Sequence, residues 1–143
     1  VLDIYIHIQY KIINIFFLGK VFNHKSVFSL MNILIKYKGK RLNINVKKLG
    51  KFSKGIGLMF KNKNSENLLF EFDRDTNISI HSLFVFFSFL IIWLDAKNNV
   101  LEYKIVRPFS FYVNARNNFR KFVEIPLNKN NKKILQFFKI RLN

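Results

Sequence analysis

An apolar run at residues 78–94, ISIHSLFVFFSFLIIWL, constrains the fold more than any other part of the chain. A transmembrane helix needs about 20 apolar residues, whereas this run is shorter and is interrupted by three serines and a histidine. Its apolar residues are mostly Phe, Ile and Val, which lose rotamer freedom in a helix and suit a buried, pleated surface. We therefore predict two strands, broken near Phe87 and Ser88. A membrane anchor over residues 78–94 is the alternative.

Alternation of apolar and polar residues predicts strands on both sides of this run. Residues 33–36 and 42–47 alternate on either side of a Lys-Gly-Lys turn, a pattern typical of a β-hairpin. Ile134, Phe137 and Phe138 recur at helical spacing and predict a short C-terminal helix that packs one face on the sheet. Further strands are predicted at residues 68–72, 90–94, 100–106, 109–113 and 119–127, with turns rich in Asp and Asn at residues 73–77, 95–99 and 114–118.

The predicted fold is mainly β, a small sandwich or partly closed barrel of about seven strands. A short helical turn at residues 51–54 precedes the segment GLMF at residues 57–60. A chain of 143 residues is expected to form one domain, and we assign it to residues 31–143. Residues 1–30 lack clean periodicity and are predicted to be a peripheral extension that folding does not need. Four large aromatic residues are predicted to lie in the core: Phe60, Phe70, Phe84 and Trp93.

The chain carries a formal net charge of +17, and the arrangement of this charge is as informative as its size. No acidic residue lies between Ile4 and Ser65. Such a field attracts nucleic acids and anionic membranes. A composition rich in Lys, Asn, Ile and Phe and poor in Gly, Pro and Ala is also typical of an AT-rich coding sequence, which is a second explanation of the charge. The candidates for polyanion binding are Lys36, Lys38, Lys40, Arg41, Lys47, Lys48, Lys51 and Lys54.

The sequence contains no assembled catalytic, metal or cofactor motif. The absence of Cys excludes disulfides and thiolate metal sites, and the three His residues have no metal-ligand spacing. No metal and no cofactor is therefore predicted. The acidic residues are dispersed, and Glu102 and Glu124 are expected at exposed strand positions. A hydrolase-like set of Ser82 or Ser88 with His81 can be written down, but its spacing does not single it out.

Five segments follow one another in a distinctive order: GIGLMF at residues 55–60, LLFEF at 68–72, IHSLFVFFSFLIIWLD at 80–95, NNVLEYKIVRPF at 98–109 and FVEIPLN at 122–128. The most specific part is GLMF, followed at the right distance by the aromatic segment and an Asp turn. In this order the chain resembles the domain of unknown function family 192 (DUF 192) over residues 31–138. The resemblance implies a small β-rich sandwich or barrel and brings no established activity with it.

Departures from the DUF 192 pattern bear on any ligand site. Lys61 stands where the family has a basic residue after GLMF, and His81 keeps the position of the family's histidine. Ser88 and Leu90 stand where the family has Pro and Asp, so a ligand site built on those two residues is lost here. The remaining candidates for ligand binding are Lys61, His81 and Ser88.

These observations together predict a non-catalytic binding or interaction module of the DUF 192 type in the cytoplasm. Its partner is unknown, and nonspecific contact with a polyanion is one option. Two alternatives stay open. One is a membrane-associated basic protein anchored by residues 78–94, and the other is a hydrolase-like enzyme around His81.

Overall fold

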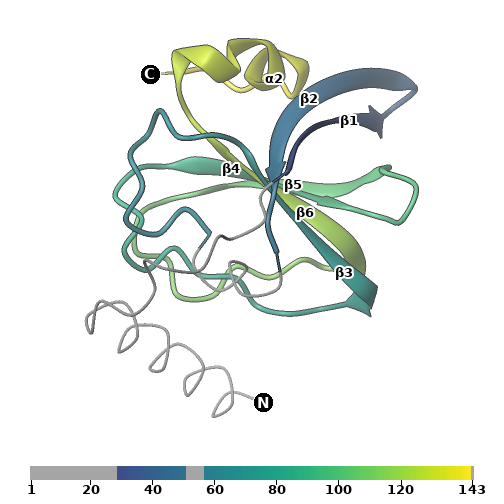
Figure 1. Cartoon of the computed structure of the whole chain (residues 1–143), viewed down its shortest axis with the longest axis horizontal. Helices are drawn as coiled ribbons and strands as arrows, with labels where there is room; N and C mark the ends of the chain where they lie inside the picture. Colours follow the sequence, from purple (N-terminus) through teal and green to yellow (C-terminus); the bar gives the residue numbers. More distant parts are fainter. Residues whose placement is uncertain (1–28, 51–56, 143) are drawn as a thin grey trace.

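The computed structural model describes residues 29–50 and 57–142, and the fold is mainly β, as predicted (Figure 1). Within these residues six strands form a single sheet in the order β1-β2-β3-β6-β4-β5. A 3-10 turn, η2 (Lys129–Asn131), leads into the expected C-terminal helix, α2 (Lys132–Phe137). The strands are β1 (Ser29–Tyr37), β2 (Lys40–Lys48), β3 (Leu68–Thr76), β4 (Phe89–Leu94), β5 (Val100–Val106) and β6 (Phe119–Pro126).

The sheet is curled, so that β1 at one edge contacts the turn between β4 and β5 at the opposite end of the sheet. β1 is an edge strand, and the Lys36 backbone N–H donates to the carbonyl of Asn98, in the turn after β4, at 3.0 Å. The same contact includes an isolated parallel bridge between Lys36 and Asn99. The Asp95 carboxylate holds this turn, since it accepts the backbone N–H groups of Lys97 and Asn99, each at 2.8 Å. The sheet is therefore a half-closed barrel, in agreement with the barrel form of the prediction.

Local chemistry explains where the hairpin turns and where the C-terminal helix begins. Lys38 and Gly39 have φ values of +47° and +74°, which is the two-residue turn whose twist matches that of the flanking strands. The Asn128 side chain accepts the backbone N–H of Asn131 at 3.1 Å and so caps η2. Both features lie where the sequence predicts a turn and a helix start.

β4 and the second half of β6 lie inside the sheet and are buried on both faces. In β4, Phe89, Ile91 and Trp93 join one core cluster, whereas the residues between them join the other. Burial on both faces explains why this segment is a continuous apolar run instead of an alternating one. The anchor over residues 78–94 is wrong, because residues 89–94 form a strand. No helix in the described ranges is long and apolar enough to cross a membrane.

Two cores lie on the two faces of the sheet. The inner core contains the apolar residues of the β1–β2 hairpin and is closed by Ile134 and Leu135 of α2 and by Phe138, which follows the helix. α2 lies across one end of the molecule, at the top of Figure 1. The outer core contains Phe70 and Trp93 and is covered, within the described chain, by loops that follow β2, β3 and β5. Loop residues, rather than a second sheet, therefore complete the outer face.

Two predicted strands are loops. Residues 78–88 and 109–113 contribute one isolated bridge, between Ile80 and Val113, and no ladder. The second segment cannot continue a strand because Pro108 has no N–H to donate and the next residue, Phe109, has a φ of +59°.

Other sequence expectations also change. Four residues of the predicted turn at 73–77 instead extend β3 to Thr76. Phe70 and Trp93 are buried as predicted, and Phe84 is partly buried against the outer core. Phe60 was expected inside, but 45% of it is exposed, because residues 57–60 form a turn to which strand alternation does not apply.

Parts of the domain prediction lie outside the described residues. These are the helical turn at residues 51–54 and residues 1–28 of the proposed extension. β1 begins at Ser29, two positions before the predicted start of the domain, and pairs with Lys48 there.

Replacement of Trp93 by Ala tests the outer core. The side chain is fully buried and its ring centroid lies 6.4 Å from that of Phe119, so Trp93→Ala should lower the free energy of unfolding by about 3–5 kcal/mol. Phe111, which is 64% exposed, provides a matched aromatic control that should change stability by about 0.5 kcal/mol. Urea unfolding of the full chain measures both. Equal effects at the two positions would contradict the assignment of the outer core.

Candidate functional site

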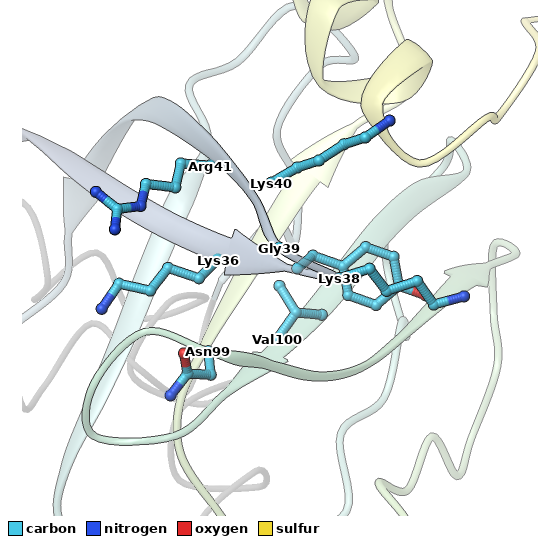
Figure 2. Close-up of a pocket in the computed structure, with 8 residues that line it drawn as sticks. Lys36, Lys38, Gly39, Lys40, Arg41, Asn99 and Val100 are labelled. Carbon is cyan, nitrogen blue, oxygen red and sulfur yellow. The ribbon is translucent and has the colours of Figure 1, made fainter.

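A basic pocket lies at the tip of the β1–β2 hairpin, where the hairpin meets the turn after β4 (Figure 2). Its volume is about 360 Å³, and it is lined by Lys36, Tyr37, Lys38, Gly39, Lys40, Arg41, Asn99 and Val100. In Figure 2 the side chains of Lys36, Arg41 and Asn99 extend to one side of the hairpin, and those of Lys38 and Lys40 to the other. Four of the sequence candidates for polyanion binding therefore line this pocket, two on each side of the hairpin.

Backbone pairing places two of these cations side by side. Lys36 and Arg41 are direct partners across the antiparallel hairpin. Like charges at opposite positions of paired strands repel and destabilise the pair. The Lys38 Nζ lies 5.2 Å from the centroid of the Tyr37 ring, which forms an aromatic side of the pocket. Among the described residues, no carboxylate forms an ion pair with any of the four pocket cations.

The other lysine candidates are placed differently. Lys47 and Lys48 lie at the far end of β2, where Lys47 pairs with Glu66 at 3.6 Å and Lys48 pairs with Glu71. The hydrogen bond from Lys48 is the main reason why the pKa of Glu71 lies below its usual value. Lys51 and Lys54 lie outside the described residues. The basic pocket thus contains one half of the predicted set.

The three ligand-binding candidates, Lys61, His81 and Ser88, lie on two loops of the outer face. The Lys61 backbone N–H donates to Leu58 at 3.1 Å and closes the turn at residues 57–60. His81 is half-buried, its Nδ1 accepts the backbone N–H two residues later at 3.3 Å, and burial lowers the pKa of its imidazole. The Ser88 carbonyl accepts the backbone N–H of Leu127 at 3.2 Å. Each of them has a contact that supports a loop.

Glu124 is a candidate site residue that the sequence analysis missed. It was expected at an exposed strand position, yet only 5% of it is exposed. Its partners in the neighbouring strands are Leu68 of β3 and Ile91 of β4, and both are fully buried. The available signal is the segment FVEIP, in which this carboxyl has two apolar neighbours on each side. Such a segment fits a strand that is covered on both faces.

Gly57 makes room for the Glu124 carboxyl. It has a φ of +51°, and a Cβ at this position would lie 2.9 Å from Glu124 Oε2 and 3.2 Å from Phe70 Cζ. Glycine is therefore required both by the backbone and by the space. The following residue, Leu58, donates its backbone N–H to the carboxyl. Glu124 Oε2 has no hydrogen-bond partner among the residues that the structure describes.

The protonation state of Glu124 follows from this environment. Burial raises the pKa of its carboxyl to about 8, although the Leu58 N–H and the positive charge of Lys61 both act to lower it. At neutral pH the group is a carboxylic acid that can donate a hydrogen bond. Buried groups with strongly shifted pKa values are enriched at functional sites, so Glu124 is a second candidate centre. Within the described ranges, no three His, Asp or Glu side chains gather as metal ligands.

Known proteins provide similar folds for comparison. No family model matches the chain, and no curated protein matches it. One similar solved structure is a protein of unknown function from Novosphingobium aromaticivorans DSM 12444, with a TM-score of 0.61, 13% identity and coverage of 73% of this chain and 78% of that one. Another is a candidate transcription regulator from Sinorhizobium meliloti 1021, with a TM-score of 0.64, 11% identity and coverage of 83% and 92%. At these identities the likeness establishes the fold alone.

The pH dependence of stability tests the state of Glu124. Since the folded chain keeps a proton that the unfolded chain loses, the free energy of unfolding should fall as pH rises from about 4.5 to about 8. In the middle of this window the contribution of Glu124 has a slope of about 1.4 kcal/mol per pH unit. Glu124→Gln should remove this contribution, because the amide has nearly the same shape and does not titrate. Urea unfolding at several pH values measures it.

The difference in the free energy of unfolding between the unmodified chain and Glu124→Gln reports the contribution of Glu124 alone. The lowered pKa of His81 acts in the opposite direction, because the folded chain then binds fewer protons and stability rises with pH through the ordinary His range. This contribution is common to both proteins and cancels. Parallel pH profiles would show that Glu124 ionises with an ordinary pKa and would remove it as a candidate centre.

Proposed function

We propose that the chain is a non-catalytic binding module whose basic pocket holds the phosphate groups of a nucleic acid. The observation that carries this proposal is the set of four cations around one pocket with no acidic residue in its lining. Cations that face no carboxylate can replace the counterions condensed on a phosphate backbone. Arg41 can bind a phosphate through two N–H groups, and the lysines act as point charges.

Repulsion within the hairpin supports an anionic ligand. The direct pairing of Lys36 with Arg41 disfavours the empty hairpin, and a phosphate bound beside both side chains removes that penalty. Compositional bias can raise the number of lysines, but it does not by itself collect cations around one pocket and leave carboxylates out. The clustering of cations around one pocket therefore supports an anionic ligand more strongly than the net charge does.

We expect the module to bind the backbone and not to read bases. The Tyr37 ring, the aromatic group in the pocket, already packs against Tyr103 at 5.7 Å and Phe138 at 5.6 Å between ring centroids. It is thus not available as a platform on which a base can stack. Phosphate contacts alone give affinity without sequence preference. A nucleic-acid ligand is in keeping with the similar structure that is described as a candidate transcription regulator.

We also propose that the chain is a domain of the DUF 192 type. Two of the segments that carry the resemblance meet in space, since GLMF begins at Gly57 and FVEIPLN contains Glu124. This contact gives both segments a shared role, in which the glycine leaves space for the buried carboxyl.

Salt dependence of DNA binding tests the pocket. The full chain should bind duplex DNA of mixed sequence, and the logarithm of its binding constant should fall linearly with the logarithm of the salt concentration. The double variant Lys36→Gln, Arg41→Gln should reduce the magnitude of this slope by about 1.8, since each lost phosphate contact contributes about 0.9. Fluorescence anisotropy over a series of salt concentrations measures the slope.

The matched control removes the same charge elsewhere. Lys63 and Arg74 are exposed and lie outside the pocket, so Lys63→Gln, Arg74→Gln should leave most of the slope intact. An equal loss in both double variants would assign binding to diffuse charge and overturn the pocket proposal. If the unmodified chain does not bind DNA at low salt, composition becomes the explanation of the net charge.

A further inference from the structure

Exposed aromatic side chains gather on the loops that cover the outer core. Their exposed fractions are 45% for Phe60, 62% for Phe86, 50% for Phe109, 64% for Phe111 and 67% for Tyr112. They come from the loops after β2, β3 and β5, and we call this set the aromatic loop face. Contiguous apolar patches on a protein surface commonly mark interaction sites, whereas single exposed residues do not.

Two ring contacts connect the three loops that carry the aromatic loop face. The rings of Phe86 and Phe109 meet edge to face, with centroids 5.5 Å apart. The Phe60 ring stacks on that of Phe84 at 5.1 Å, and the Phe60 backbone N–H donates to the Phe84 carbonyl at 3.0 Å. The loop after β3 therefore links the loop after β2 to the loop after β5.

Buried hydrogen bonds hold these loops behind the rings. The Ser82 side chain is fully buried, and its hydroxyl donates to the Arg107 carbonyl and accepts the Ser110 N–H, each at 2.7 Å. Ile80 and Val113 exchange two backbone bonds, at 2.8 and 3.0 Å. The rings are thus presented by a fixed support, which reduces the conformational entropy that binding would otherwise cost.

Three of the phenylalanines have a backbone conformation that bulky residues rarely adopt. The φ values are +58° at Phe60, +58° at Phe84 and +59° at Phe109. Each such conformation costs about 1–2 kcal/mol. About half of Phe60 and of Phe109 is exposed, whereas Phe84 is partly buried against the outer core. Strain of this kind concentrates at functional sites.

The charge around the aromatic loop face is mainly positive. The loops at residues 57–67, 77–88 and 107–118 contain one acidic residue, Glu66, and four basic residues, Lys61, Lys63, Arg107 and Arg116. Of these cations, Arg116 pairs with Glu102 at 3.7 Å. Arg107 is exposed, and no carboxylate pairs with it in the described part of the chain. A second copy of this face would bring like charges together. An anionic partner with an apolar interior is complementary to it.

We propose that the aromatic loop face docks the protein on an anionic lipid bilayer. The phenylalanine rings and the Tyr112 ring enter the boundary between headgroups and acyl chains, where aromatic side chains are favoured. Arg107 and its neighbouring cations bind lipid phosphates from the side. This mode needs no membrane-spanning segment and leaves the basic pocket, which belongs to the β1–β2 hairpin, as a separate site.

Vesicle binding tests the proposal. The full chain is mixed with phosphatidylcholine vesicles with and without phosphatidylserine, and the bound fraction is measured by flotation. Binding should require phosphatidylserine. The variant Phe86→Ser, Phe111→Ser should bind about tenfold more weakly, because two apolar rings no longer enter the bilayer. The matched control Leu101→Ser, Ile105→Ser, at two exposed positions of β5, should bind like the unmodified chain.

Further measurements separate the two proposals and the other occupants of the face. The variant Phe86→Ser, Phe111→Ser should keep the DNA affinity of the unmodified chain, which shows that the basic pocket is intact. It should also keep the thermal melting of the unmodified chain, which shows that the variant is folded. Equal vesicle binding by this variant and by the unmodified chain would overturn the proposal. Concentration-dependent dimerisation that this variant loses, without vesicle binding, would overturn it in favour of a second copy as occupant.

Discussion

Burial of β4 and β6 on both faces is the constraint on which the rest of the structure depends. A strand that is covered on one side can expose polar residues on the other, but every residue of β4 is buried and therefore must find a partner or be apolar. The inner face is covered by the β1–β2 hairpin and α2, and the outer face by loops. Coverage by loops places irregular backbone, with its turns and exposed rings, directly over the core. Both candidate features of the outer face, Glu124 and the aromatic loop face, result from this arrangement.

Glu124 shows how much the outer core depends on one loop. Its carboxyl is tolerable inside the protein because it is protonated, because Leu58 donates to it, and because Gly57 leaves space above it. An ionised carboxylate in the same place would lose most of its solvation and gain one hydrogen bond and the distant charge of Lys61. The turn at residues 57–60 and the carboxyl therefore specify each other. The loop is held in position by a polar group that an all-apolar core would not provide.

The sequence predicted the features that have a strong local cause. The hairpin follows from strict alternation around a Lys-Gly turn, β4 and β5 from the Asp95 turn, and α2 from helical spacing after Asn131. Residues 78–88 and 109–113 were predicted wrongly because their composition suits strands, while their conformation is set by the distant contact of Ser82 with Arg107 and Ser110. All four cations of the basic pocket were among the eight residues predicted from charge alone, but the charge did not separate them from the other four. Glu124 was missed because burial on both faces depends on strand order, which the sequence pattern does not contain.

The way in which the β1–β2 hairpin is attached to the sheet affects the equilibrium between a formed pocket and an opened one. β1 and β2 pair at nine positions, whereas β2 and β3 pair at two, so the hairpin is joined to the rest of the sheet mainly by apolar packing. Such packing is not directional, and a unit held in this way can open at a lower free energy than the whole domain. Opening would break the bond from Lys36 to Asn98 and separate the cations from the turn that completes the pocket. An anion that binds only the docked hairpin must therefore also close the barrel, and its affinity and the stability of the curled sheet are linked quantities.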